Sequence, residues 1–250
     1  MNVHQVNLSS KGTTYFTADH HLWPEELPES LVHFSEELKE GDAWWILGDF
    51  FEVWVENHWS VRPGYEDLLT LIKKLTNRGV EVYLLVGNRD FSAGKRLKKA
   101  TGMKVFNGGM SFEVKGETHL VIHGDELLPD DTSYQKFKGV IRNPVILFLL
   151  RCFPMSWLLK LAGETRRQSK SKLENISMTK FEMKPDLIED ICQKLNISKC
   201  WAGHLHLKQE KTFILSSKKL EVEVLSESNK EELHALSWSS KQTPSYKSWV

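Results

Sequence analysis

The chain has 250 residues, of which 40% are hydrophobic and 26% are charged. These values are typical of globular domains and exclude a collagen-like, coiled-coil or intrinsically disordered protein. Lysine and arginine (33 residues) balance aspartate and glutamate (33 residues). The chain therefore lacks the net positive field that neutralises a nucleic-acid backbone, and we expect no nucleic-acid partner.

Cysteine usage and the N-terminal residues indicate where the protein works. Cys152, Cys192 and Cys200 show no CxxC spacing, which argues against a disulfide framework and against a thiolate zinc site. Residues 1–12 lack the apolar core of a secretory signal. The most apolar tract, 145–161, is interrupted by charges and a proline and is shorter than the roughly 20 apolar residues of a spanning helix. We therefore expect a cytoplasmic protein.

Apolar runs rich in β-branched and aromatic residues predict five strands. In chain order these strands cover residues 13–18, 43–47, 81–86, 119–122 and 199–202. Amphipathic patterns between them predict helices at 29–40, 65–78 and 185–195. Two more strands, at 212–215 and 220–225, are expected at the edge of a second sheet. Alternating strands and helices predict βαβ units, a largely parallel sheet and an α/β fold.

Metal-binding types of side chain follow each of the five strands. These seven residues are Asp19, His21, Asp49, Asn88, His123, His204 and His206. A glycine precedes Asp49, Asn88 and His204, and we expect it to let the backbone turn sharply. For one such motif alone, a polar turn residue is the better interpretation. Five strand ends are hard to explain in that way, because ligands of open α/β sheets gather outside the carboxyl ends of the strands.

The types of ligand indicate the chemistry. Three oxygen donors and four imidazoles are too many for one ion, and they suit a pair of divalent ions such as Mn²⁺, Fe²⁺ or Zn²⁺. Asp49 is the carboxylate that could bridge the two ions. Such a pair stabilises the attacking and leaving oxygens of a displacement at phosphorus, so the sequence predicts hydrolysis of a phosphoester or pyrophosphate.

The complete set of motifs resembles the calcineurin-like metallophosphoesterases. The motifs are DHH at 19–21, GD at 48–49, GNRD at 87–90, HGD at 123–125 and GHLH at 203–206. Longer strings, ILGDFFEVW from 46, GNRDF from 87 and HGDELLPDDTSYQKFK from 123, resemble the UDP-2,3-diacylglucosamine hydrolases of lipid A biosynthesis. The resemblance implies one αββα sandwich domain over 1–250, made of two sheets flanked by helices, with a helical cap insertion at about 139–180. It also implies a pyrophosphatase that releases UMP and 2,3-diacylglucosamine 1-phosphate, and two divalent ions, with Mn²⁺ as the expected metal.

The resemblance also implies roles for individual residues. One ion would lie on Asp19, His21, Asp49 and His206, and the other on Asp49, Asn88, His123 and His204. The last four residues would form the catalytic set. The implied substrate contacts are Asn88, Arg89, Asp131, Tyr134, Ser169 and His204. For Arg89 the alternative is an ion pair with Asp90, whereas Asp131 could be a turn residue and Tyr134 a helix-packing ring.

Two residues depart from the family pattern. His20 stands where an apolar residue is usual, and it could face away from the metals or be a surplus ligand. Leu205 replaces a small hydroxyl residue. These differences leave room for a related phosphoesterase with another nucleotide or phospholipid substrate. A non-catalytic scaffold is a third interpretation, but such a protein would be expected to have lost metal ligands.

The tract at 143–163 has two interpretations. Its apolar segments, 145–150 and 153–161, are followed by basic residues. The functional interpretation is a cap that encloses acyl chains and touches the cytoplasmic face of the inner membrane through its basic flank. The alternative is a helical hairpin packed on the core. The expected partners are therefore an acylated UDP-sugar and the membrane surface, with no protein partner.

Overall fold

The structure is a computed structural model. It describes residues 1–8, 11–56, 64–130, 132–141, 143–154, 156–161, 163–164, 183–206, 208–215, 218–239 and 242–250.

The first of its two sheets is built around four parallel strands. Its members are β2 (Thr14–Thr17), β3 (Ala43–Ile46), β4 (Glu81–Leu85), β5 (Lys104–Phe106), β11 (Leu233–Ser239) and β12 (Gln242–Trp249). Their order is β12-β11-β2-β3-β4-β5. Strands β2 to β5 run parallel, while β11 is antiparallel to both of its neighbours.

The second sheet is mixed. Its members are β1 (Val3–Gln5), β6 (Gly109–Val114), β7 (Glu117–Val121), β8 (Ile197–Ala202), β9 (Gln209–Ile214) and β10 (Lys219–Val224), in the order β1-β6-β7-β8-β10-β9. The five predicted strands thus exist, but they are divided between two sheets. A largely parallel sheet describes only part of the molecule. Of the two predicted edge strands, β9 lies at the edge of this sheet, whereas β10 lies between β8 and β9.

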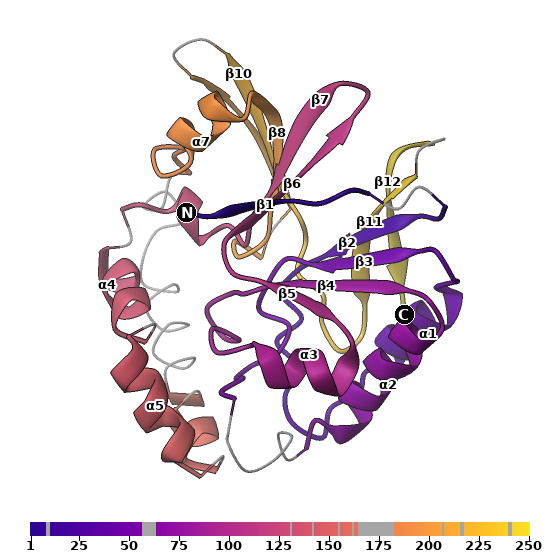
Figure 1. Cartoon of the computed structure of the whole chain (residues 1–250), viewed down its shortest axis with the longest axis vertical. Helices are drawn as coiled ribbons and strands as arrows, with labels where there is room; N and C mark the ends of the chain where they lie inside the picture. The colour runs from indigo at the N-terminus through magenta and orange to yellow at the C-terminus, as the bar shows by residue number, and fades with distance from the viewer. Residues whose placement is uncertain are drawn as a thin grey trace.

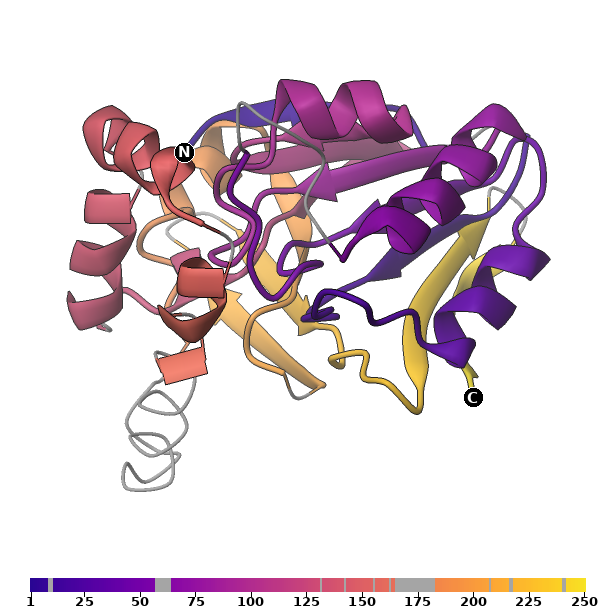
Figure 2. The ribbon, with the colours of Figure 1, turned by 90° about the horizontal axis from the view of Figure 1, so that it is seen from below.

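The two sheets pack face to face and helices cover their outer faces (Figures 1 and 2). Because side chains alternate along a strand, neighbouring residues of β3 enter different cores. Trp44 packs with Phe34 in the core between the first sheet and its helices. Trp45 packs with Phe112 and Trp201 between the two sheets. The predicted αββα sandwich is confirmed.

In the described part of the chain, four helices form the outer layers. α1 (Glu29–Glu37), α2 (Glu66–Asn77) and α3 (Lys95–Thr101) lie beside the first sheet, and α7 (Glu189–Lys194) lies beside the second. The apolar face of α2, with Leu68, Ile72 and Leu75, is buried in the helix-side core. Cys192 of α7 is buried against the second sheet.

A helical arm stands apart from the sandwich, on the side toward which β2, β3 and β4 run (Figure 1). We define the arm as α4 (Thr132–Ile141), α5 (Pro144–Cys152) with the Phe153 that follows it, and the helical residues 156–161. α5 has no buried residue, so the expectation of a hairpin packed on the core is wrong for this helix. The exposed apolar side chains of the arm are Val140, Val145, Phe148, Leu149, Phe153, Trp157 and Leu161.

The arm touches the sandwich through a small apolar cluster. Leu158 is buried against Val53 and Val55, which lie in the loop after β3. No helix in the described ranges is long and apolar enough to cross a membrane.

Candidate metal centre

The candidate ligands meet at one edge of the sandwich, where strands of both sheets end. They include two groups of three residues, and within each group the ligand atoms all lie within 4.8 Å of one another. One group joins Asp49, His123 and His204, and the other joins Asp19, His21 and Asp49. Asp49 belongs to both groups, which is the geometry required of a bridging carboxylate.

The backbone is strained where these side chains are displayed. Asp19, His21, Asp49, His204 and His206 have φ angles of 54°, 49°, 51°, 69° and 61°. Only three other non-glycine residues of the described chain have a positive φ. This left-handed conformation is unfavourable for residues with a Cβ and is concentrated at functional sites. The clustering therefore favours a site that uses these five side chains.

Two of the glycines that precede candidate ligands, Gly48 and Gly87, are required for different reasons. Gly48 has a φ of +94°, as the expected sharp turn requires. At Gly87 no positive φ is found, but an added Cβ would lie too close to Asp49 Oδ1. For Gly87, close packing rather than turn geometry requires glycine.

Asp49 organises the centre. Its Oδ1 accepts hydrogen bonds from the backbone N–H groups of Asn88 (2.8 Å) and Arg89 (2.9 Å). His123 Nε2 lies 3.7 Å from Oδ1, and His21 Nε2 lies 3.9 Å from Oδ2. Although burial opposes ionisation, the charges of His123, His21 and Arg89 lower the pKa of Asp49. This carboxylate is held charged inside the protein.

Three imidazoles have their Nδ1 atoms directed to an oxygen. His123 Nδ1 donates to the Leu47 carbonyl (2.8 Å), and His206 Nδ1 lies 2.5 Å from Glu227 Oε2. His21 Nδ1 lies 3.5 Å from Glu52 Oε2. The hydrogen bonds at Nδ1 of His123 and His206 fix the orientation of those rings and leave Nε2 as the atom that can bind a cation, whereas His21 Nδ1 has no hydrogen-bond partner in the described part of the chain.

The electrostatics of the centre couple protons to metal binding. Burial lowers the pKa of His123, but the charges of Asp49 and Asp125 outweigh burial and raise it to about 9. Burial and the nearby His123 lower the pKa of His204 to about 3. Burial raises the pKa of Asp19. A cation bound at His123 would have to displace the proton from that ring.

Several atoms are arranged as a cation requires. Asp19 Oδ1 and His21 Nε2 are buried without a hydrogen-bond partner in the described part of the chain. The side-chain amide of Asn88 lies between His123 and Asp49, with Oδ1 2.6 Å from His123 Nε2. An amide oxygen beside a carboxylate fits a ligand set that shares a cation. The residues present therefore fit divalent metal ions.

Comparison with protein families agrees with this geometry. The model of the calcineurin-like phosphoesterases matches residues 12–208, a range that contains all seven candidate ligands. The chain belongs to this family. It is therefore a metal-dependent hydrolase, and its family implies divalent metal ions.

Within the family, this phosphoesterase is similar to curated proteins that share one name. The chain is 34% identical over 196 residues to a UDP-2,3-diacylglucosamine hydrolase of Enterobacter sp. (strain 638), covering 77% of this chain and 81% of the relative. It is 31% identical to the enzyme of that name from Yersinia enterocolitica, covering 82% and 86%. A solved archaeal phosphodiesterase is similar at a TM-score of 0.44 and 13% identity, covering 95% of this chain and 99% of that one. That structural similarity is too low to carry an argument.

At Arg89 the structure contradicts only the alternative interpretation. Its guanidinium pairs with Glu52, at 3.1 Å from Nη1 to Oε1. The suggested ion pair with Asp90 is wrong, because the buried Asp90 carboxylate accepts backbone N–H groups of Gly87 and Phe50 instead. Glu52 and Glu227 are site neighbours that sequence reasoning missed. A charged residue inside the apolar run at 50–55 was the available signal for Glu52.

The two departures from the family pattern lie away from the ligand atoms. His20 Nε2 bonds to Thr17 Oγ1 (2.8 Å), and its ring packs against Trp44 and Phe50. His20 therefore faces the helix-side core and is not a surplus ligand. Leu205 packs against the outer core of the second sheet.

Some expected substrate contacts fall outside the described residues. Asp131 and Ser169 lie in ranges that the structure does not describe, as do the basic residues after the arm. Tyr134 lies in α4, and its side chain is outside the description. Their roles stay predictions.

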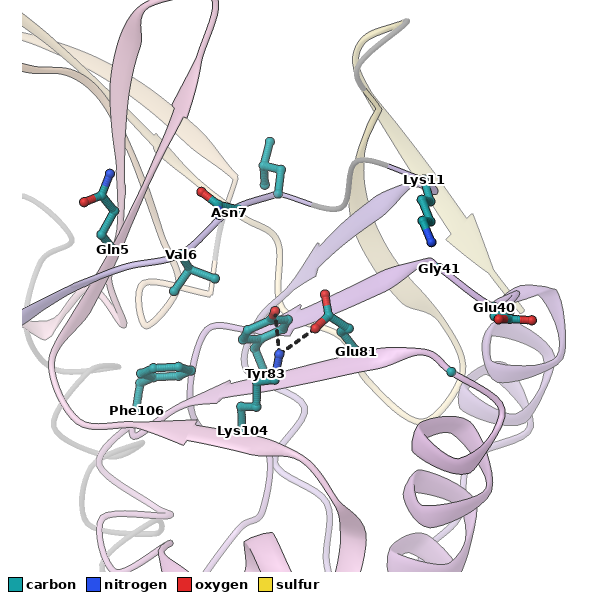
Figure 3. A pocket seen from close by; sticks show the side chains of 12 residues that line it. Gln5, Val6, Asn7, Lys11, Glu40, Gly41, Glu81, Tyr83, Lys104 and Phe106 are labelled. Carbon is teal, nitrogen blue, oxygen red and sulfur yellow. Dashed lines mark hydrogen bonds and ion pairs between the residues drawn. The ribbon is translucent and has the colours of Figure 1, made fainter.

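A hollow of about 810 Å³ lies elsewhere, between the N-terminal segment and strands β4 and β5 (Figure 3). Lys104 Nζ reaches both Glu81 (2.5 Å) and the Tyr83 hydroxyl (3.1 Å) there. The hollow is lined by none of the seven candidate ligands, and Lys104 and Glu81 in it form an ion pair with each other. We therefore locate the candidate active site at the metal centre.

Proposed function

We propose that this phosphoesterase hydrolyses the pyrophosphate bond of UDP-2,3-diacylglucosamine, giving UMP and 2,3-diacylglucosamine 1-phosphate in lipid A biosynthesis. The observation that carries the proposal is the pair of ligand groups that share Asp49. The choice of substrate follows from the names of the relatives, which are similar to this chain over about four fifths of their length.

The proposed ligands are the seven residues at the strand ends. One cation would lie on Asp19, His21, Asp49 and His206, and the other on Asp49, Asn88, His123 and His204, with Mn²⁺ as the proposed metal. Two bound cations polarise a phosphoryl group and lower the pKa of a nearby water.

The protein's own residues position the substrate. Arg89 has a planar fork of donors that suits a phosphate, and its side chain is 20% exposed beside Asp49. We propose that Arg89 binds the pyrophosphate, together with Asn88 and His204. Asp131, Tyr134 and Ser169 are proposed to contact the remainder of the substrate. The water oxygen joins the phosphorus nearer the uridine, and the bond from that phosphorus to the bridging oxygen breaks.

We propose that the arm is part of a cap over about 139–180 that binds the acyl chains. Phe148 and Trp157 are 56% and 66% exposed, and gathered exposed apolar side chains of this size mark sites of ligand, membrane or protein contact. Each acyl methylene removed from water contributes about 0.8 kcal/mol to binding. The same surface would hold the protein at the cytoplasmic face of the inner membrane.

Product analysis tests the proposed reaction. Hydrolysis in ¹⁸O-labelled water should place the label on UMP. Label on the sugar phosphate alone would contradict attack at the uridine-side phosphorus. The control substrate is bis(4-nitrophenyl) phosphate, a small phosphodiester that needs only the metal centre. Turnover of the control without release of UMP would leave the phosphoesterase intact and overturn the proposed substrate.

The other two interpretations have less support. His20 and Leu205 pack into cores rather than toward the ligand atoms, so neither departure argues for a different substrate. A non-catalytic scaffold gives no reason for strained backbone at five candidate ligands.

A further inference from the structure

Glu52 is a buried carboxylate that lies beside two side chains of the candidate site, Arg89 and His21. Its side chain has 0% exposure. Oε1 lies 3.1 Å from Arg89 Nη1, and Oε2 lies 3.5 Å from His21 Nδ1. Each oxygen thus faces a different functional side chain.

The backbone fixes Glu52 between those partners. Its N–H donates to the Leu22 carbonyl (2.8 Å), and Trp54 N–H donates to the Arg89 carbonyl (2.9 Å). The Tyr65 hydroxyl also donates to the Leu22 carbonyl (2.8 Å). The loop after β3 is therefore joined on one side to the His21 turn and on the other to the Arg89 turn.

A fold that needed only packing at this position would be better served by an apolar side chain. Burying a carboxylate is costly unless cationic partners and hydrogen bonds compensate it. Phe51 and Val53, on either side of Glu52, are buried apolar residues. Core packing therefore does not explain why residue 52 is a carboxylate.

We infer that Glu52 is a positioning residue for the phosphate-binding Arg89 and the metal-binding His21. It holds the Arg89 fork through Nη1, so that the other guanidinium N–H groups can meet a phosphate. Its other oxygen lies beside Nδ1 of the His21 ring, whose Nε2 lies 3.9 Å from Asp49 Oδ2, so the Glu52 carboxylate helps to hold that ring beside Asp49. The inference rests on the proposed function, because it assumes the roles of Arg89 and His21.

A double-mutant cycle tests the inference in the full chain. We expect Glu52→Gln to lower kcat/KM by about 10- to 100-fold, as loss of an outer ligand contact does. The loss should appear with both the acylated UDP-sugar and bis(4-nitrophenyl) phosphate. In the background of Arg89→Ala, the same change should cost much less, because one of its two targets is already missing.

Glu223→Gln is the matched control. Glu223 is also a buried carboxylate, 8% exposed, and it pairs with Lys199 at 3.0 Å. Its hydrogen bonds go to Trp201 and Tyr246 rather than to candidate ligands. Glu223→Gln should change the melting temperature about as much as Glu52→Gln but leave kcat/KM near the wild-type value.

Chemical rescue separates positioning from structure. Added guanidinium should partly restore the activity of Arg89→Ala, because the Glu52 carboxylate can still bind the guanidinium ion. Rescue should be much weaker in the double variant with Glu52→Gln. A purely structural role of Glu52 predicts equal rescue in both backgrounds.

Three results would overturn the inference: near-wild-type kcat/KM for Glu52→Gln, full additivity with Arg89→Ala, or equal rescue. If Glu52→Gln does not fold, Glu52→Asp, which keeps the charge but withdraws it by one methylene, enters the same cycle. If the wild-type protein does not hydrolyse the acylated UDP-sugar, the proposed function fails. The cycle then proceeds on bis(4-nitrophenyl) phosphate and still decides the role of Glu52.

Discussion

The metal centre and the helical arm differ in which side chains they bury: the centre buries charged residues, and the arm exposes apolar ones. At the centre, Asp19 and Asp49 are 0% and 1% exposed, and the backbone is strained to display them. In the arm, Leu149 and Trp157 are 49% and 66% exposed, and α5 has no buried residue, although its Leu150 is partly buried. The polar side chains of the centre are buried in the sandwich, whereas the apolar side chains of the arm are exposed to solvent.

The contrast separates two tasks within one domain. A preorganised polar centre in a buried setting suits bond cleavage, because its groups need little rearrangement during the reaction. Exposed apolar helices suit the binding of a partner that covers them. Substitutions in the two regions should therefore change different measured quantities.

Asp49→Ala should have the largest effect. We expect kcat to fall by more than about 100-fold, because even the loss of an outer ligand contact costs 10- to 100-fold. Activity and bound metal, measured together, check this prediction.

Asp42→Ala is the control for that variant. Asp42 is 8% exposed and its carboxylate, like that of Asp49, accepts two backbone N–H groups, from Thr13 (2.7 Å) and Lys39 (2.8 Å). Its loss should cost about 1 to 3 kcal/mol of stability without loss of metal. Equal activity losses in the two variants would contradict a special role for Asp49.

The pH should change metal affinity in a defined direction. Below the His123 pKa of about 9, the ring carries a proton that a cation must displace. The affinity for Mn²⁺ should therefore rise about tenfold per pH unit for each proton released. His204, with its pKa lowered to about 3, should release none. Titration calorimetry between about pH 6 and about pH 8 checks this slope, and a flat profile would contradict it.

Within the arm, exposed and buried positions should behave differently. Leu149→Glu together with Trp157→Glu should raise KM for the diacylated substrate by about tenfold, equivalent to losing about two methylene contacts. Turnover of bis(4-nitrophenyl) phosphate and the melting temperature should hardly change. Parallel losses in both activities and in stability would sink the proposed acyl-binding role.

Leu158→Ala provides the contrast within the arm. Leu158 is 5% exposed and packs on Val53 and Val55. Its truncation should cost about 2 to 5 kcal/mol of unfolding free energy if the arm unfolds with the sandwich. Denaturant titration measures the loss, and an unchanged free energy of unfolding would show that the arm opens separately.

His20→Leu should have the smallest effect on catalysis. Its neighbours in sequence are candidate ligands, but its side chain bonds to Thr17 on the helix side. We expect a stability loss of about 1 kcal/mol and kcat within about twofold of wild type, a change worth less than 1.4 kcal/mol. A metal-free or inactive His20→Leu variant would show that the ring supports the centre more directly.

Much of the centre could be predicted because local signals coincide with it. Buried strands such as 43–47 are continuous apolar runs, and each ends at a glycine or a polar ligand type. The outer strands gave weaker signals. β12 contains Thr243, Pro244 and Lys247, and its identity as a strand depends on pairing with β11. Such non-local pairing is not written in local periodicity.

The missing parts of the site depended on contacts distant in sequence. Glu227 reaches His206 across 21 residues, and Glu52 meets Arg89 only after β3 and β4 have aligned. Glu227 has no local motif that separates it from a solvated surface charge, and for Glu52 the only local signal was its place inside the apolar run at 50–55. The orientation of His20 likewise depended on which face of the turn met Trp44.

The number and coupling of bound metal ions test the central claim most directly. Mn²⁺-loaded wild-type protein, studied by elemental analysis and electron paramagnetic resonance, should hold two ions per chain with an exchange-coupled signal, because Asp49 belongs to both ligand groups. Asp49→Ala should lose the coupled signal, whereas Asp42→Ala should keep it. A single, magnetically isolated ion in the wild-type protein would contradict the account.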